Sequence, residues 1–184
     1  REDAIKLSDF YSQAFNAEYQ AATDPGIAAE DVLHLESMRA DRCEISIAFS
    51  NRGPSISVAG IEGATELKVY LLGKRLILSD FMPILEDVGL RVIAANPYEV
   101  ELLNESGTVY IFAVQDQEQQ QLTVDSRGEL LSETILASRS GDVISDSLNA
   151  LALSAGLHWR EVDVLRGYLG YAFQIGAVPS RVSI

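Results

Sequence analysis

Hydrophobic and polar residues alternate along the chain in patterns that predict two helices, a sheet interrupted by one helix, and a helical C-terminal part. Residues 6–21 and 27–38 carry apolar side chains at helical spacing, and the turn signal TDPG at 23–26 separates them. The Gly- and Ser-rich residues 51–64 are typical of a loop or an irregular strand pair. Strand patterns cover residues 43–50, 65–73, 91–95, 98–104 and 108–115, with a bend expected at Asn96-Pro97 and a hairpin turn at ESG.

One helix is specified closely by its own residues, in the stretch LSDFMPILEDVGL at 78–90. Ser79 or Asp80 can accept hydrogen bonds from the free amides at the helix start, and Pro83 then falls in the first turn. Gly89 suits the left-handed position that ends a helix. Glu86 is expected to face solvent, and the buried face is predicted to consist of Phe81, Leu85 and Val88.

The C-terminal part begins after the polar connector DQEQQQ at 116–121 and predicts helices over 127–139 and within 143–176, the latter broken near Gly156. His158 stands at the start of the last helix, where we expect it to cap or to pack. This helix is apolar on two sides, so neighbours are expected on both. We expect the first side to dock on the preceding domain, and the second to meet a domain outside this chain or to self-associate. The first side comprises Trp159, Val162, Leu165, Leu169 and Phe173, and the second comprises Val164, Tyr168, Tyr171 and Ile175.

The order of these elements predicts an α+β fold: a ferredoxin-like sandwich with an antiparallel sheet and helices on one sheet face, followed by a helical segment. We place a helical lead-in at residues 1–26, the α+β domain at 27–121 and the helical segment at 122–184.

Charge and cysteine content narrow the classes of partner. The 27 acidic residues outnumber the 14 basic ones, giving a net charge of −13 that repels nucleic acid and anionic membrane surfaces. One cysteine, Cys43, excludes an internal disulfide and suits a reducing compartment. With no apolar stretch long enough to span a membrane, we expect a cytoplasmic protein. The start REDAIKL and the end PSRVSI suggest a piece of something longer.

Residues that could perform chemistry do not form a recognisable catalytic pattern. LLGKRL lacks the upstream glycine of a phosphate-binding loop, and the loop glycines lack dinucleotide-binding spacing. His34 and His158 have no companion cysteines for a zinc site. Carboxylate pairs such as Glu86-Asp87 are typical of solvated helix faces. The sequence therefore predicts no catalytic, cofactor-binding or metal-binding residue in this chain.

Three ordered motifs resemble the large bacterial NAD-specific glutamate dehydrogenases. LSDFMPILEDVGLRVIAANPYEVEL at 78–102 is similar to a stretch of that family, and YSQAFNAEYQAATDPGIAAEDVLHLESM at 11–38 is similar to another. The third motif, in DSLNALALSAGLHWREVDVLRGYLGYAFQIG, is similar to the family's signature at Asp146, Asn149, Leu151, Ala155, Leu157, Trp159 to Val162 and Leu165-Arg166. The chain departs from the family pattern at Ala94-Ala95 and at Gly167 and Gly170, where each glycine costs a helix roughly 1 kcal/mol.

The resemblance implies an ACT-like α+β module followed by the start of a helical segment that precedes the catalytic domain. It implies a non-catalytic regulatory and assembly module of an enzyme that interconverts L-glutamate and 2-oxoglutarate plus ammonium. NAD would serve the parent enzyme, with no cofactor in this part. The implied partners are other domains and subunits of that enzyme, in a homo-oligomer.

Two alternatives to that role stay open. One is a stand-alone amino-acid-binding module. ACT-type domains often hold an amino-acid effector where a loop meets a helix start, and Ser79 and Asp80 are the candidate effector-binding residues because helix N-terminal amides attract a carboxylate. Asp80 would partly oppose such an anion, and both residues could simply cap the helix. The other alternative is a purely structural packing module.

Overall fold

The computed structural model describes residues 14–51, 61, 63–102, 106–124 and 127–177. Parts of the predicted helix over 6–21 and of the predicted loop over 51–64 lie outside these residues. By its contacts the chain divides into two compact units. The first comprises Arg1–Leu76 and Ile93–Val114, and the second comprises Ile77–Val92 and Gln115–Ile184. The domain boundaries expected after residues 26 and 121 stay predictions.

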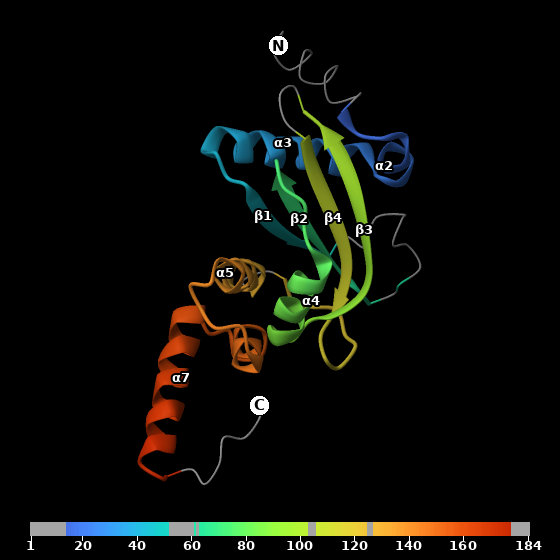
Figure 1. Ribbon diagram of the computed structural model, residues 1–184. Helices are drawn as coiled ribbons and strands as arrows, with labels where there is room; N and C mark the ends of the chain where they lie inside the picture. The colour runs from blue at the N-terminus through green and yellow to red at the C-terminus, as the bar shows by residue number, and fades with distance from the viewer. Residues whose placement is uncertain (1–13, 52–60, 62, 103–105, 125–126, 178–184) are drawn as a thin grey trace. The chain divides into compact units, whose positions relative to one another are not determined.

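A four-stranded antiparallel sheet confirms the predicted α+β class (Figure 1). Its strands run in the order β1-β2-β4-β3. Strand β2 pairs antiparallel with β1 in the register Ile47↔Val69, and with β4 in the register Lys68↔Ile111. Because β4 lies between β2 and β3, these three strands and the intervening helix α4 form the split βαβ arrangement of ferredoxin-like folds. The strands are β1 Ile45–Ser50, β2 Thr65–Leu72, β3 Arg91–Glu101 and β4 Ser106–Gln115.

Two helices cover one face of this sheet, α2 (Ala17–Ala22) and α3 (Pro25–Asp41). Asp24 accepts a hydrogen bond from the amide of Gly26, so the predicted turn TDPG is also the cap of α3, with Pro25 as its first residue. Leu35 and Met38 of α3 pack in one apolar cluster with residues of strands β2, β4 and β3, namely Tyr70, Leu72, Val109, Ile111, Ala113, Tyr98 and Val100.

Strand β3 continues through Pro97, so the predicted bend at Asn96-Pro97 is wrong. A proline lacks the N–H that a central strand must donate, but β3 is the last strand in the sheet order. An edge position therefore tolerates the proline without interrupting the strand. The outer side of β3 makes one isolated antiparallel bridge, between Val100 and Phe15.

The second unit contains α4 (Leu78–Asp87), which contacts α5 (Arg127–Ser140) and the 3-10 helix η2 (Ser147–Ala150). Phe81, Leu85 and Val88 are fully buried and Glu86 is exposed, as the apolar pattern predicts. Gly89 ends the helix at φ +87°, and a Cβ there would lie 3.4 Å from the Cβ of Ala150. Glycine therefore suits this position for two reasons: it adopts the positive φ without strain, and it leaves room for the close approach of Ala150.

The start of α4 differs from the prediction. The helix begins at Leu78, and the residue in the N-cap position, Ile77, offers no side-chain cap. Ser79 and Asp80 are consequently inside the first turn, and Pro83 lies inside the helix instead of in its first turn. The proline has no N–H for the carbonyl four residues earlier, which is a local cost that the buried apolar face must offset.

The C-terminal helices are α6 (Leu151–Ala155) and α7 (Trp159–Gln174), separated at Gly156 with φ +68° as predicted. His158 caps α7: its Nδ1 accepts from the amide of Arg160 at 3.1 Å, and Glu161 returns a bond to the His158 amide at 2.9 Å. His158 Nε2 also lies 2.9 Å from a carboxylate oxygen of Glu133 on α5. The capping role expected for His158 is confirmed.

Candidate functional site

The two residues singled out as effector ligands, Ser79 and Asp80, lie side by side in the first turn of α4 and are both exposed. The Ser79 hydroxyl donates to Asp80 Oδ1 at 3.2 Å. Neither side chain caps the helix, so the capping interpretation is wrong. Asp80 instead complements the positive end of the helix dipole, and it would compete there with an incoming carboxylate. Effector binding at this place stays a prediction.

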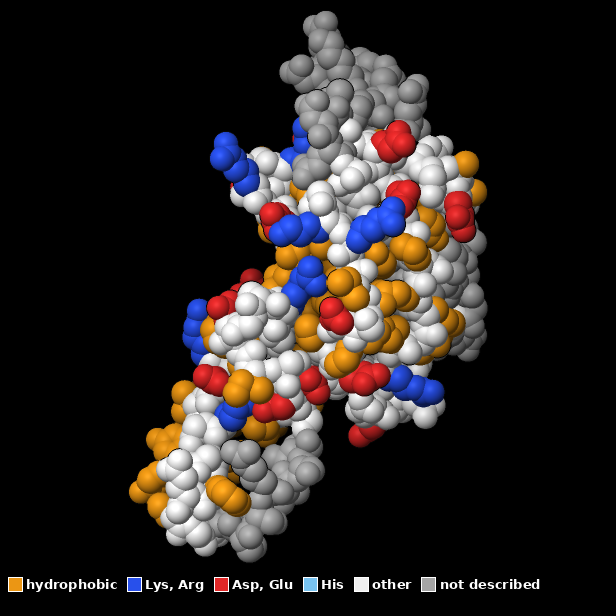
Figure 2. Space-filling model, viewed as in Figure 1, with side chains coloured by type: hydrophobic (Ala, Val, Ile, Leu, Met, Phe, Trp, Pro, Cys, Tyr) orange, Lys and Arg blue, Asp and Glu red, His pale blue; other side chains and the backbone are white. Residues whose placement is uncertain are grey.

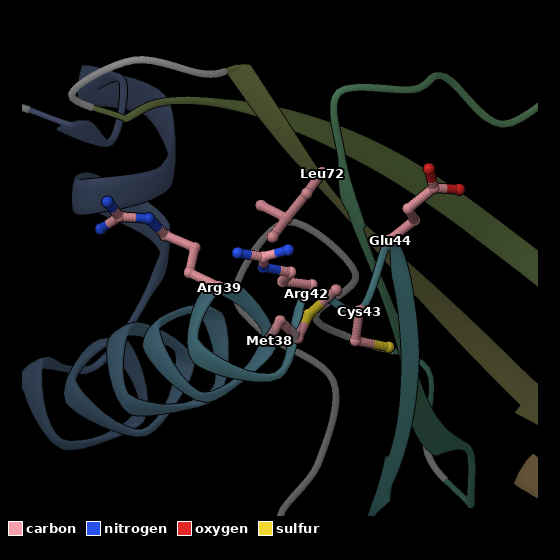
Figure 3. A pocket seen from close by; sticks show the side chains of 6 residues that line it. All are labelled: Met38, Arg39, Arg42, Cys43, Glu44 and Leu72. Carbon is pink, nitrogen blue, oxygen red and sulfur yellow. The ribbon is translucent and has the colours of Figure 1, made fainter.

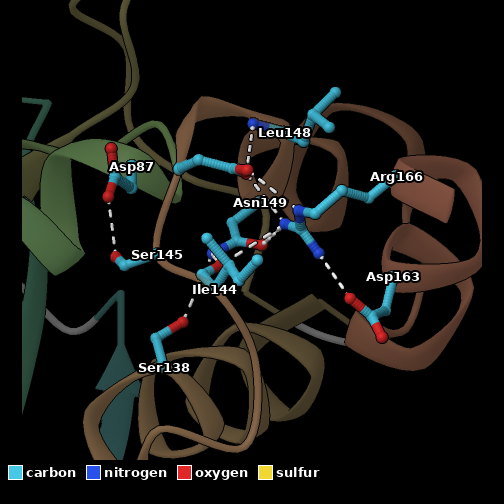
Figure 4. Close-up of polar contacts among 9 residues, drawn as sticks. Asp87, Ser138, Ile144, Ser145, Leu148, Asn149, Asp163 and Arg166 are labelled. Carbon is cyan, nitrogen blue, oxygen red and sulfur yellow. Dashed lines mark hydrogen bonds and ion pairs between the residues drawn. The ribbon is translucent and has the colours of Figure 1, made fainter. Parts of the chain in front are cut away.

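Arg166 on α7 is the centre of a polar network that holds the helical unit together (Figure 4). Its guanidinium binds Asp146 through two bonds of 2.9 and 2.8 Å, and it reaches Asp163 at 2.8 Å. It also donates to Asn149 Oδ1 at 3.1 Å and to the carbonyl of Ile144 at 3.3 Å. The hydrogen bonds that Arg166 donates to Asp146 hold the pKa of its guanidinium above the ordinary value. The planar fork of arginine suits this bidentate arrangement.

Asn149 and Asp146 connect that guanidinium to the backbone of the same unit. Asn149 is fully buried, and its amide donates to the Ile144 carbonyl at 3.0 Å and to Ser138 on α5 at 3.3 Å. Asp146 caps η2 through the amide of Leu148. Asp146, Asn149 and Arg166 belong to the family signature at residues 146–166, and their bonds give that motif a structural role, because they position α7.

A second polar cluster lies inside the first unit, around the carboxylate of Asp31 on α3. Asp31 is 2% exposed and accepts hydrogen bonds from the hydroxyls of Tyr19 and Tyr70. Lys68 Nζ lies 2.8 and 2.6 Å from its two oxygens, and 3.8 Å from the buried carboxylate of Glu66. One carboxylate thus joins α2, α3 and β2 within the core.

Burial and the negative charge of Asp31 raise the pKa of both tyrosine hydroxyls well above the ordinary value, with burial as the larger cause. The two tyrosines therefore stay protonated and act as donors. His34 stands next to this cluster, with its ring 4.3 Å from that of Tyr70 and its Nε2 2.7 Å from Ser46 Oγ. Burial lowers the pKa of His34, partly opposed by Asp31.

The Asp31 cluster was missed by the sequence analysis, although a signal for it exists. Asp31, Leu35 and Met38 follow the spacing i, i+4 and i+7, which places an acidic residue on the apolar face of α3. Glu66, Lys68 and Tyr70 likewise share one face of β2 because alternate strand residues point the same way. Opposite charges on two faces that pack together predict a buried ion pair.

A surface hollow of about 270 Å³ lies where α3 ends and β1 begins (Figure 3). Two arginines, one acidic residue and the cysteine border it, together with two buried apolar side chains. Cys43 donates its thiol hydrogen to the carbonyl of Ile45 and is half-buried. The lining residues are Met38, Arg39, Arg42, Cys43, Glu44 and Leu72.

From Val164 onward, α7 is exposed on both of its apolar sides. On the first side only Val162 is fully buried, whereas Leu165, Leu169 and Phe173 are 41%, 45% and 43% exposed. The expected docking of this side on the preceding domain stays a prediction. The second side is more open, at 59% for Val164, 70% for Tyr168, 60% for Tyr171 and 60% for Ile175. Figure 2 shows hydrophobic side chains on the surface of α7.

Among the described residues, no three His, Cys, Asp or Glu side chains gather in a group that could hold a metal ion. No helix in the described part of the chain has both the length and the hydropathy to cross a membrane.

Three family models match the chain, and all three describe parts of glutamate dehydrogenase. The chain matches the glutamate dehydrogenase ACT3 domain over residues 57–127, helical motif 3 over 143–184 and helical motif 2 over 1–38. The NAD-specific glutamate dehydrogenase of Pseudomonas aeruginosa is 34% identical over 170 residues, which cover 92% of this chain and 10% of that protein.

Two further relatives carry the same description. The NAD-specific glutamate dehydrogenase of Halomonas elongata is 27% identical over 175 residues, or 95% of this chain, and that of Mycobacterium tuberculosis is 28% identical over 172 residues, or 90%. The chain spans about a tenth of the length of each of these relatives.

Proposed function

Because this chain belongs to the NAD-specific glutamate dehydrogenase family, we propose that it is a non-catalytic regulatory and assembly module of such an enzyme. The parent enzyme would interconvert L-glutamate and 2-oxoglutarate plus ammonium in the cytoplasm, with NAD bound elsewhere in its chain. The observation that carries the assembly role is the open apolar surface of α7. The match to an ACT3 domain supports the regulatory role.

The α7 surface differs in composition from the start of the same helix. Its first turns carry Arg160, Glu161, Asp163 and Arg166, whereas residues 167–177 contain no charged side chain. Seven large apolar side chains on this helix are more than 40% exposed. Contiguous apolar patches of this kind mark protein–protein contacts more often than free surface. We call the residues Val164, Tyr168, Tyr171 and Ile175 the α7 face.

The proposed occupant of the α7 face is another domain or subunit of the parent enzyme. The relatives are about ten times longer than this chain, so such domains exist in the family. Arg166 and its partners fix α7 relative to η2 and α5, which presents the face in a defined orientation. A rigidly presented apolar helix face suits docking between domains better than binding of a small ligand.

Self-association of the 184-residue chain is the first expected consequence. In the absence of other domains, the α7 faces of two copies should pair, so the apparent mass should rise with concentration in light scattering. Tyr171→Glu should weaken this association by about tenfold or more, the equivalent of about 1.4 kcal/mol, because it places a charge in the contact. Gln174→Glu adds the same charge to α7 outside both apolar sides and should change the association little. Equal effects of the two substitutions would contradict an interface at the α7 face.

The second expectation concerns catalysis by the isolated chain. We expect no glutamate-dependent reduction of NAD or NADP, because its sequence shows neither a nucleotide-binding loop nor a recognisable proton-transfer group. Absorbance of the reduced cofactor measures this directly, with the full-length enzyme as the positive control. Activity in clean protein that a point substitution within residues 1–184 abolishes would contradict a non-catalytic module.

A further inference from the structure

We propose that the hollow at the end of α3 binds a small aliphatic dicarboxylate, with Arg42 as its principal ligand and Arg39 as the second. The hollow would be the effector site of the proposed regulatory role. Only the description of the ligand as an effector rests on that role. The hollow of about 270 Å³ lies wholly within the first unit, at the junction of α3 and β1. Its lining residues do not include Ser79 and Asp80, the candidate effector-binding residues at the start of α4.

The backbone of Arg42 is the first reason to assign its side chain a role. Arg42 ends α3 in the left-handed conformation, at φ 53° and ψ 37°. Glycine or asparagine fills that position at lowest cost, whereas a long side chain is strained there. The capping bonds of residue 42 come from its backbone N–H, which donates to the carbonyls of Arg39 and Met38. Glycine would make the same bonds, so the fold alone does not favour an arginine.

The charges around the hollow are the second reason. Arg39 is paired with Glu36 at 2.8 Å, and Glu44 with Lys74. Arg42 is exposed, and no carboxylate of the described residues lies within ion-pair distance of its guanidinium. Figure 3 shows the Arg42 side chain next to Leu72 and between Arg39 and Glu44, which extend to opposite sides. An anion in the hollow can therefore bind Arg42 without displacing a carboxylate of the described residues.

The lining selects among anions. Guanidinium groups bind carboxylates in a bidentate manner. Arg42 can bind one carboxylate directly, and Arg39 can bind a second only by exchanging its partner Glu36, so the pair of arginines favours a ligand with two carboxylates. Met38 and Leu72 are 3% and 5% exposed and give the hollow an apolar floor, which suits methylene groups and not inorganic phosphate. A ligand ammonium would need Glu44, which already pairs with Lys74. The lining thus favours a dicarboxylate over an α-amino acid.

Titration calorimetry of the full 184-residue chain with glutarate tests this assignment. We expect saturable binding that Arg42→Gly and Arg42→Gln each weaken by at least tenfold. Arg75→Gln is the matched control, because it removes the same charge from an exposed arginine of the same unit and should leave binding unchanged. Arg42→Gly should also raise the melting temperature of the ligand-free chain, since it relieves the left-handed strain. Loss of binding together with a gain in stability separates a ligand-binding role from a structural one.

Three results would overturn the assignment. Absence of glutarate binding, or binding that Arg42→Gly leaves unchanged, would show that Arg42 serves only the negative end of the α3 dipole. Phosphate binding as tight as glutarate would show a general anion site, and L-glutamate binding more tightly than glutarate would show an amino-acid site. None of these results alters the expected association through the α7 face, which lies in the other unit, so this assignment and the proposed function fail separately.

Discussion

Asp31→Ala is expected to lower the free energy of unfolding by about 3–5 kcal/mol, the largest effect we predict for a single substitution. It removes the one carboxylate that accepts from Tyr19, Tyr70 and Lys68, all of which are buried. Lys68 Nζ would then have the Glu66 carboxylate, at 3.8 Å, in place of a close ion-pair partner. Two tyrosine hydroxyls would lose their acceptor in a place that water does not reach.

Chemical denaturation measures this effect, and Asp41→Ala is the matched control. Asp41 belongs to the same helix but is exposed, so its loss should change stability by no more than about 0.5 kcal/mol. A double-mutant cycle with Asp31→Leu and Lys68→Met should show that the double change costs much less than the sum of the single changes, because neither member of this ion pair is then left buried without the other. If Asp31→Ala and Asp41→Ala had the same effect, the Asp31 cluster would not stabilise the fold.

Leu85→Ala should cost about 2–5 kcal/mol, the usual range for a fully buried leucine. Leu85 lies in the middle of the buried face of α4, between Phe81 and Val88, and all three are fully buried. The substitution leaves a cavity in the contact of α4 with α5 and η2.

Glu86→Ala provides the comparison on the neighbouring residue. Glu86 is exposed, and alanine is a better helix former, so the change should be close to neutral. Thermal melts of the two variants distinguish the faces of α4. Similar shifts in melting temperature for Leu85→Ala and Glu86→Ala would mean that the assigned buried face of the helix is wrong.

Apolar periodicity predicted the elements whose burial is one-sided. The spacing of Phe81, Leu85 and Val88 identified α4 and its buried face because only one arrangement hides all three. Gly89 and Gly156 marked helix ends because each occupies a positive φ that glycine adopts without strain. The α+β order followed from these elements.

Features that depend on tertiary neighbours were not predictable in the same way. A bend at Pro97 was expected because proline lacks an N–H, and only the strand order reveals that β3 is at the edge and needs none there. The cap of α4 was expected at Ser79 or Asp80, but the helix starts at Leu78 and Ile77 is in the N-cap position. Single-sequence patterns locate helix starts less precisely than helix faces.

The candidate sites also differ in how much of them the sequence reveals. Asp146, Asn149 and Arg166 were noticed as members of a motif, yet their mutual bonds emerge only when η2 and α7 are placed in space. Arg42 gave no sequence signal, because its left-handed backbone and its place in the hollow are properties of the folded chain. The apolar sides of α7 were visible from periodicity, but whether they are covered is a matter of neighbours.

Hydroxyl-radical footprinting of Tyr168 and Tyr171 tests most directly whether this chain packs and positions parts of a larger enzyme. The two side chains are 70% and 60% exposed here, so they should be oxidised rapidly in dilute 184-residue chain. In the full-length parent enzyme, the account predicts that their oxidation slows severalfold, because another domain or subunit covers the α7 face. Equal oxidation rates in the isolated chain and the full-length enzyme would contradict an assembly role for this face.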